Sequence, residues 1–158
     1  MTLRRVQLPP NVSGALWLGS MPGRFEPWSA FLEEARAARI GQVVCLTPRT
    51  EMAELAAPYH AAVVGGRLPF RWTQLAMRNF GLPENVEEFR EGVRDVAVTL
   101  QRGESVLLHC AAGLGRTGSA AACVLKALGL DTPTALQRVR DAGSNPQNAQ
   151  QSGFVDWF

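Results

Sequence analysis

Short apolar runs alternate with longer amphipathic stretches along this chain, and that order predicts an α/β fold. We predict strands at residues 15–18, 43–46, 62–64 and 105–109. The second and fourth runs are continuously apolar, as in strands that are buried on both faces of a parallel sheet. We therefore expect one domain with a central, mostly parallel sheet flanked by helices.

Helices are predicted between and after these strands. The expected ranges are residues 28–39 (stopped by Gly41), a short helix from residue 47, then 83–101, 115–129, 132–143 and a last helix that includes Phe154 and Trp157. In the range 83–101, apolar residues recur at steps of three and four, which marks one buried face. For the short helix we expect Thr47 as N-cap and Pro48 at the first helical position.

Length and composition limit the possible classes of protein. The 158 residues suit one domain over 1–158, and 46% hydrophobic with 19% charged residues excludes a disordered or fibrous chain. Sixteen basic against 14 acidic side chains leave a charge of +2, so neither nucleic acid nor a membrane is an expected partner. No signal peptide or membrane-spanning run is evident. The expectation is a cytoplasmic protein, with a monomer favoured.

The chain has three cysteines, Cys45, Cys110 and Cys123. Three scattered thiols make neither a disulfide framework nor a zinc site, so no metal is expected. Cys123 falls on the apolar spacing of a predicted helix and is expected to pack in the core.

One segment carries candidate chemistry: a predicted buried strand ends at Cys110, and a loop of small residues leads to Arg116 and a helix. Such a loop can turn its N–H groups inward and bind an anion at the helix N-terminus. Arg116 offers two parallel donors to phosphoryl oxygens. The positive field of this arginine and of the helix N-terminus also favours the thiolate form of Cys110, which is a nucleophile. The plainer alternative is an ordinary core thiol before a simple turn.

The loop residues have matching roles in this hypothesis. Gly113 and Gly115 would supply positive φ angles, while small Ala111 and Ala112 let the backbone approach a ligand. The expected substrate-binding residues are Ala111, Ala112, Gly113, Leu114, Gly115 and Arg116.

His109-Cys110, five residues, then Arg116-Thr117-Gly118 resembles the signature of cysteine-based protein tyrosine and dual-specificity phosphatases. Residues 43–51 resemble the strand-then-helix segment of the kinase-associated phosphatase group, and residues 79–83 the loop that carries the general acid. The resemblance implies the fold of that family, a phosphoprotein or phosphopeptide substrate, and no metal or organic cofactor.

The resemblance also implies a two-step mechanism. Cys110 would attack phosphorus, and water would then hydrolyse the phosphocysteine. Thr117 matches the hydroxyl that hydrogen-bonds the cysteine sulfur, and His109 matches the histidine that orders the loop.

Two further residues correspond to family positions less specifically. Gln151 aligns with the glutamine that positions water, although Gln147 and Gln150 are close enough to shift that register, and a plain terminal helix explains the segment as well. Cys45 is either core packing or a redox partner of Cys110, as in relatives with a second cysteine at the matching place.

Asn79 departs from the family, which has an aspartate as the general acid at this position. An amide cannot protonate a leaving alkoxide, a contribution typically worth 10²–10⁴-fold in rate. Glu84 and Glu51 are the nearest substitutes, and each has a simpler role within its own helix. Asn79 could be an engineered substitution, a natural restriction to leaving groups that need little protonation, or the mark of a binding protein.

We therefore expect a phosphatase of phosphotyrosine, and of phosphoserine or phosphothreonine in a dual-specificity enzyme, impaired by Asn79. The alternative is a catalytically weak module that binds phosphate or phosphoproteins. Four residues before the acid loop either line the cleft or belong to a solvated loop: Arg67, Arg71, Trp72 and Arg78.

Overall fold

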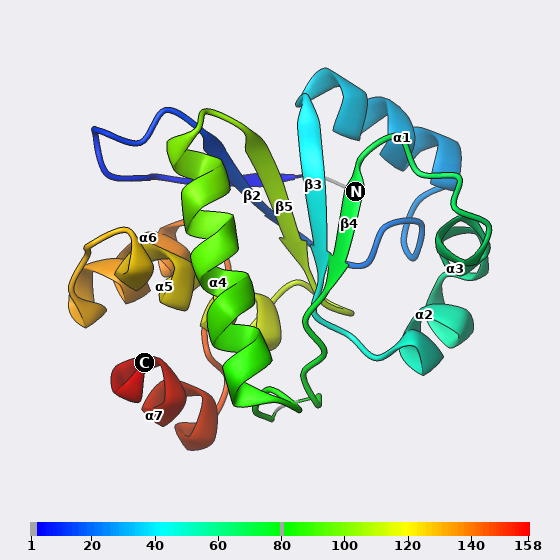
Figure 1. Cartoon of the computed structure of the whole chain (residues 1–158). Helices are drawn as coiled ribbons and strands as arrows, with labels where there is room; N and C mark the ends of the chain where they lie inside the picture. The colour runs from blue at the N-terminus through cyan, green and yellow to red at the C-terminus, as the bar shows by residue number, and fades with distance from the viewer. Residues whose placement is uncertain (1–2, 80) are drawn as a thin grey trace.

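A twisted five-stranded sheet forms the centre of the computed structural model, which describes residues 3–79 and 81–158 (Figure 1). The strands are β1 (Arg4–Val6), β2 (Ala15–Gly19), β3 (Ile40–Cys45), β4 (Arg71–Gln74) and β5 (Ser105–His109). Their order across the sheet is β1-β2-β5-β3-β4, and among the pairings of these five strands only that of β1 with β2 is antiparallel. The predicted α/β class and mostly parallel sheet are confirmed.

Helices cover both faces of this sheet (Figure 1). They are α1 (Trp28–Ala37), α2 (Arg49–Leu55), α3 (Ala57–Val64), α4 (Val86–Gln101), α5 (Gly115–Ala127), α6 (Thr132–Asp141) and α7 (Ala149–Trp157). α1 to α3 lie to one side, and α4 to α7 to the other (Figure 1). Among the described residues, no helix has the length and apolar character needed to cross a membrane.

Burial from both sides explains the continuous apolar runs. On β5, Leu107 packs in a cluster with Phe31 of α1, while Val106 and Leu108 pack in the cluster that holds Phe89 of α4. Successive strand residues point to opposite faces, so a strand with helices on both faces needs apolar residues at every position.

Several predicted elements were wrong in kind or in their limits. Residues 62–64 form the end of α3 and are not a strand, because Tyr59 and Ala62 bury one side of a helix there. The cap of α2 is Pro48, since the Thr47 hydroxyl lies 3.1 Å from Cys45 Sγ instead of capping the helix. Gly41 does not stop a helix, because it lies within β3.

One further limit differs, and two strands were not predicted. α4 begins at Val86, since the Asn85 side chain caps it by accepting from the Glu88 N–H at 3.0 Å. Glu84 therefore precedes this helix. β1 and β4 are three and four residues long, and both carry exposed or half-buried polar side chains.

Parallel strands place all their carboxyl ends at one edge of the sheet. The segments that follow β2, β3, β4 and β5 therefore converge there, although they are far apart in the sequence. Ligand sites of open α/β sheets form at this edge. It is also the edge from which the segment beginning at Cys110 leaves β5.

Candidate active site

The segment from Cys110 to Leu114 connects β5 to α5 and folds back on the Cys110 thiol. Cys110 is 3% exposed, and its Sγ accepts a hydrogen bond from the Gly113 N–H at 3.2 Å. Gly113 has φ +74°, and a Cβ there would lie 2.6 Å from the Gly19 carbonyl carbon. Only glycine fits, so the positive φ expected at Gly113 is confirmed.

The structure requires a glycine at position 115 for a different reason from the positive φ that was expected. Gly115 is the first residue of α5, and it is not among the residues with positive φ. A Cβ there would lie 2.9 Å from Gln147 Oε1 and 3.0 Å from Gln151 Oε1. The glycine therefore lets the segment before α7 approach the loop, which the sequence alone did not show.

The back of the loop is fixed by polar contacts from distant elements. The Gly113 carbonyl accepts 2.6 Å bonds from Arg4 Nη2 and Ser144 Oγ. Arg4, on β1, also donates to the Ala142 carbonyl at 2.8 Å. These bonds hold the Gly113 carbonyl while its N–H faces Cys110. Burial lowers the pKa of Arg4, and its electrostatic interaction with Cys110 partly offsets that effect.

Arg116 is almost fully buried, at 3% exposure, and its guanidinium is held by two groups. Glu51 of α2 accepts from Nη1 at 2.9 Å and from Nη2 at 3.0 Å. The Met77 carbonyl accepts a further bond from Nη1 at 3.2 Å. No residue of the described ranges accepts from Nε–H or from the second Nη2–H, and these two form the side-on pair of donors that suits two phosphoryl oxygens.

A chain of hydrogen bonds supports the loop from the face of the sheet that α1 to α3 cover. His109 Nδ1 lies 3.0 Å from the Cys110 carbonyl oxygen, which can only accept, so Nδ1 carries the proton. His109 Nε2 then accepts from the Tyr59 hydroxyl at 2.7 Å, and Tyr59 in turn accepts from Trp72 Nε1 at 2.8 Å.

His109 is therefore neutral in the folded protein. Complete burial lowers its pKa to about 4, with the charge of Arg116 acting in the same direction and the bond to Cys110 opposing both. A neutral histidine that bonds the Cys110 carbonyl fits the loop-ordering role that the resemblance implies.

A pocket of about 520 Å³ opens over the loop. Its lining residues are Arg24, Glu51, Leu55, Asn79, Cys110, Ala111, Ala112, Leu114, Gly115, Arg116 and Gln147. Asn79, from the segment after β4, thus shares one pocket with the thiol and the arginine. Phe80, in the same segment, lies outside the described residues.

The basic residues suggested for the cleft mouth are not in this lining. Arg71 pairs with Glu104 at 2.8 Å, and Trp72 packs with Tyr59 behind the sheet. Arg67 and Arg78 are exposed, and neither lines the pocket. Arg24 lines the pocket instead, and the sequence carried no signal for it.

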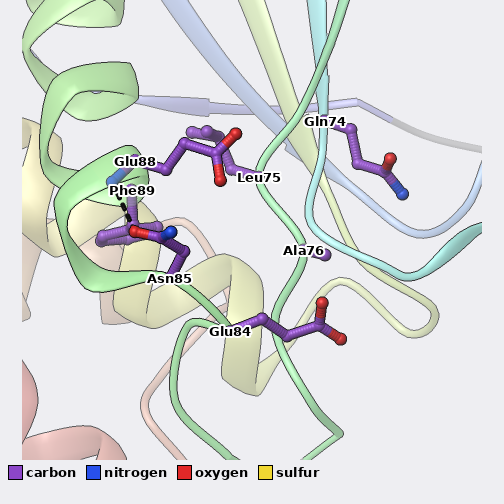
Figure 2. Close-up of a pocket in the computed structure, with 7 residues that line it drawn as sticks. All are labelled: Gln74, Leu75, Ala76, Glu84, Asn85, Glu88 and Phe89. Carbon is purple, nitrogen blue, oxygen red and sulfur yellow. Dashed lines mark hydrogen bonds between the residues drawn. The ribbon is translucent and has the colours of Figure 1, made fainter.

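The two candidate replacements for the missing acid differ in position. Glu84 lines a separate pocket between the segment Gln74–Ala76 and the start of α4, as Figure 2 shows. Glu51 lines the pocket over Cys110, but Arg116 binds both of its carboxylate oxygens. Among the lining residues in the described ranges, Glu51 is the one carboxylate.

Thr117 and Gln151 are both buried close behind the loop. Within the part of the chain that the structure describes, Thr117 Oγ1 has no hydrogen-bond partner, so it makes no bond to Cys110 Sγ. Gln151 Oε1 accepts from the Gln147 N–H at 2.7 Å, and Gln147 is the glutamine that lines the pocket.

The other cysteines are buried free thiols. Cys45 contacts Thr47 and Met52 in a cluster on the α2–α3 side, whereas Cys110 packs with the cluster on the α4–α5 side. Burial raises the pKa of both Cys45 and Cys123, that of Cys123 to about 12. A disulfide between Cys45 and Cys110 stays a prediction. No group of metal-ligating side chains occurs in ranges 3–79 and 81–158.

Comparison with known proteins agrees with this geometry. Residues 15–153 match the family described as "Swiss Army Knife protein, DSP-PTPase phosphatase domain". No curated protein shows significant sequence similarity to the chain.

Solved structures superpose over nearly the whole chain. Kinase associated phosphatase, with its catalytic cysteine replaced by serine, has a TM-score of 0.85 at 19% identity and covers 98% of this chain and 92% of its own. Tk-PTP in its active form has a TM-score of 0.70 at 26% identity, and the match covers 92% of this chain and 93% of Tk-PTP. The human tyrosine phosphatase-like serine/threonine/tyrosine-interacting protein has a TM-score of 0.70 at 20% identity, and the match covers 97% of this chain and 93% of that protein. The resemblance seen in the sequence is confirmed at the level of family and fold.

Proposed function

The chain belongs to the family of DSP-PTPase phosphatase domains, and we propose that it hydrolyses phosphate monoesters of phosphoproteins through a phosphocysteine intermediate. The observation that carries this proposal is the pairing of Cys110 and Arg116 in one pocket. The thiol accepts a hydrogen bond from a loop N–H, and the side-on donors of the buried guanidinium bond to no described residue.

In the first step, Cys110 Sγ forms a bond to phosphorus while the bond from phosphorus to the ester oxygen breaks. The bonding electrons leave with that oxygen. Arg116 and the N-terminus of α5 stabilise the negative charge on the phosphoryl oxygens. In the second step, water forms a bond to phosphorus and the bond to sulfur breaks, which restores the thiolate and releases phosphate.

Two buried polar groups are suited to the second step. The Thr117 hydroxyl, which bonds to no described residue, is available to hydrogen-bond the departing sulfur after a small movement. Gln147 lies in the pocket, where it is better placed than the buried Gln151 to orient water. Gln151 then acts through Gln147, because its Oε1 accepts a hydrogen bond from the Gln147 N–H.

Asn79 restricts the proposed substrates. Its amide lines the pocket and can donate a hydrogen bond, but it cannot transfer a proton to the leaving oxygen. Phosphotyrosine, whose phenol is more acidic than an alcohol, is therefore favoured over phosphoserine and phosphothreonine. The same observation supports the second candidate function, a phosphoprotein-binding module with weak turnover.

Hydrolysis of an aryl phosphate, measured with and without orthovanadate, separates these two functions. The proposed phosphatase releases phenol continuously, and orthovanadate inhibits the release. Cys110→Ser should abolish turnover, whereas Cys123→Ser, at a buried thiol of α5, serves as the matched control. Binding of vanadate without turnover by the parent would instead establish the binding module.

A further inference from the structure

Arg24 stands beside the phosphate-binding loop on the segment that follows β2. Its Nη1 donates to the Ala111 carbonyl at 2.9 Å, and the Met21 N–H donates to the same carbonyl at 3.3 Å. The guanidinium carbon lies 4.5 Å from the ring centroid of Phe25, which is 65% exposed. One hydrogen bond and one ring face thus hold the guanidinium at the pocket mouth.

The remaining donors of Arg24 have no use within the described protein. Its Nε and Nη2 make no hydrogen bond, and no carboxylate of residues 3–79 or 81–158 pairs with it. Of the other charged side chains in the pocket lining, Glu51 and Arg116 neutralise each other. Arg24 therefore gives the mouth of the pocket an uncompensated positive charge.

The scissile phosphate already has its own binding groups. In the proposed function, the N-terminus of α5 and the side-on donors of Arg116 bind the phosphoryl group that Cys110 attacks. A second fixed guanidinium at the rim suits a different anionic group, since planar donors bind carboxylate or phosphate in pairs.

We propose that Arg24 is a specificity-determining residue that binds a second anionic group next to the phosphorylated residue of the substrate. This inference rests on the proposed function and narrows its substrate class to acidic or multiply phosphorylated phosphopeptides. A carboxylate and a second phosphoryl group share the required chemistry, and the experiment distinguishes them.

The test uses three phosphotyrosine peptides that differ only in the residue next to phosphotyrosine, which is Glu, Gln or phosphoserine. For the parent, kcat/KM should be about fivefold higher with Glu than with Gln, the size expected of a partly exposed charge pair. The advantage should shrink as salt is raised. A larger advantage for the phosphoserine peptide alone would identify a second phosphoryl group as the natural source.

Variants assign the preference to one side chain. Arg24→Gln should bring the ratio of the Glu to the Gln peptide to about one, and Arg24→Lys should keep part of it. Arg102→Gln is the control, because it removes the same charge at the far end of α4, next to the start of β5. A ratio near one in the parent, or an equal loss on all three peptides in Arg24→Gln, would overturn the inference.

Binding of the same peptides to Cys110→Ser separates this inference from the proposed function. If the parent hydrolyses no peptide but Cys110→Ser still binds the Glu peptide more tightly than the Gln peptide, the phosphatase is rejected and the role of Arg24 is retained. If the parent hydrolyses all peptides equally, the phosphatase is retained and the role of Arg24 is rejected.

Discussion

Glu51 and Arg116 form a two-point ion pair inside the candidate active site, with Glu51 Oε1 2.9 Å from Nη1 and Oε2 3.0 Å from Nη2. The two residues are 65 positions apart, on α2 and α5. Their contact fixes the plane of the guanidinium and leaves its side-on edge for phosphate. Glu51 is therefore a positioning residue for Arg116, and Arg116 keeps it from serving as a free acid.

Glu51→Gln should lower kcat/KM for an aryl phosphate by about 10- to 100-fold, the value of a charge-assisted hydrogen bond. The amide replaces one acceptor with a donor that faces Arg116 Nη, so the guanidinium loses its fixed orientation. Glu54→Gln, an exposed site on the same helix, is the matched control. A rise in activity would show that Glu51 instead blocks the arginine from phosphate.

Arg116→Lys should lower both orthovanadate binding and turnover by more than about tenfold, although the charge is kept. A lysine ammonium cannot make the two parallel bonds to phosphoryl oxygens, and it cannot satisfy Glu51 and the Met77 carbonyl together. Vanadate inhibition and steady-state kinetics measure the two losses. Parental values for both would mean that the pocket acts only as a positive cradle.

Asn79→Asp should accelerate hydrolysis of phosphotyrosine peptides by about 10²-fold or more, because the carboxyl can protonate the leaving oxygen. The gain should shrink for aryl phosphates with acidic phenols, and the alkaline limb of the pH–rate profile should sharpen. Rates over a series of phenols give the comparison. A gain that is uniform across the series would indicate a change in binding or loop movement, and proton donation would be rejected.

Acid should destabilise the fold through His109. Its folded pKa of about 4 lies below its ordinary value of 6.5, so the unfolded chain binds the proton more readily as the pH falls. The contribution of His109 to the free energy of unfolding is thus fully present above pH 6.5, and it decreases by about 3 kcal/mol as the pH falls towards 4.

Urea unfolding between those pH values measures this effect. His109→Asn should make the decrease shallower, and His60→Gln, at the chain's other histidine, is the control. An unchanged slope in His109→Asn would show that other groups govern the acid transition.

Sequence reasoning succeeded where the signal was local. The apolar run 105–109, the small loop and the helix after Gly115 lie in one continuous segment, so the nucleophile and its arginine could be placed without tertiary information. It failed for β4, whose edge position tolerates the polar residues Arg71, Thr73 and Gln74. It also failed for residues 62–64, where three apolar residues fit a strand or a helix equally well.

The supporting residues were out of reach for a different reason. Arg4 and Arg24 act through contacts with loop carbonyls more than 80 positions away, and no periodicity or motif marks them. Glu51 was considered only as a possible acid or as a residue of its own short helix, because its pairing with Arg116 depends on how the segment after β3 meets the segment after β5. Convergence of parallel strand ends makes such meetings common, but the sequence does not specify the partners.

Trapping the intermediate tests the central claim most directly. The protein is mixed with an aryl phosphate, quenched in acid within the first turnovers, digested and mapped by mass spectrometry. The account predicts a phosphoryl group on the peptide that carries Cys110, absent in Cys110→Ser and lost once substrate is exhausted. Continuing hydrolysis with Cys110 never phosphorylated, or with the phosphoryl group on another residue, would contradict it.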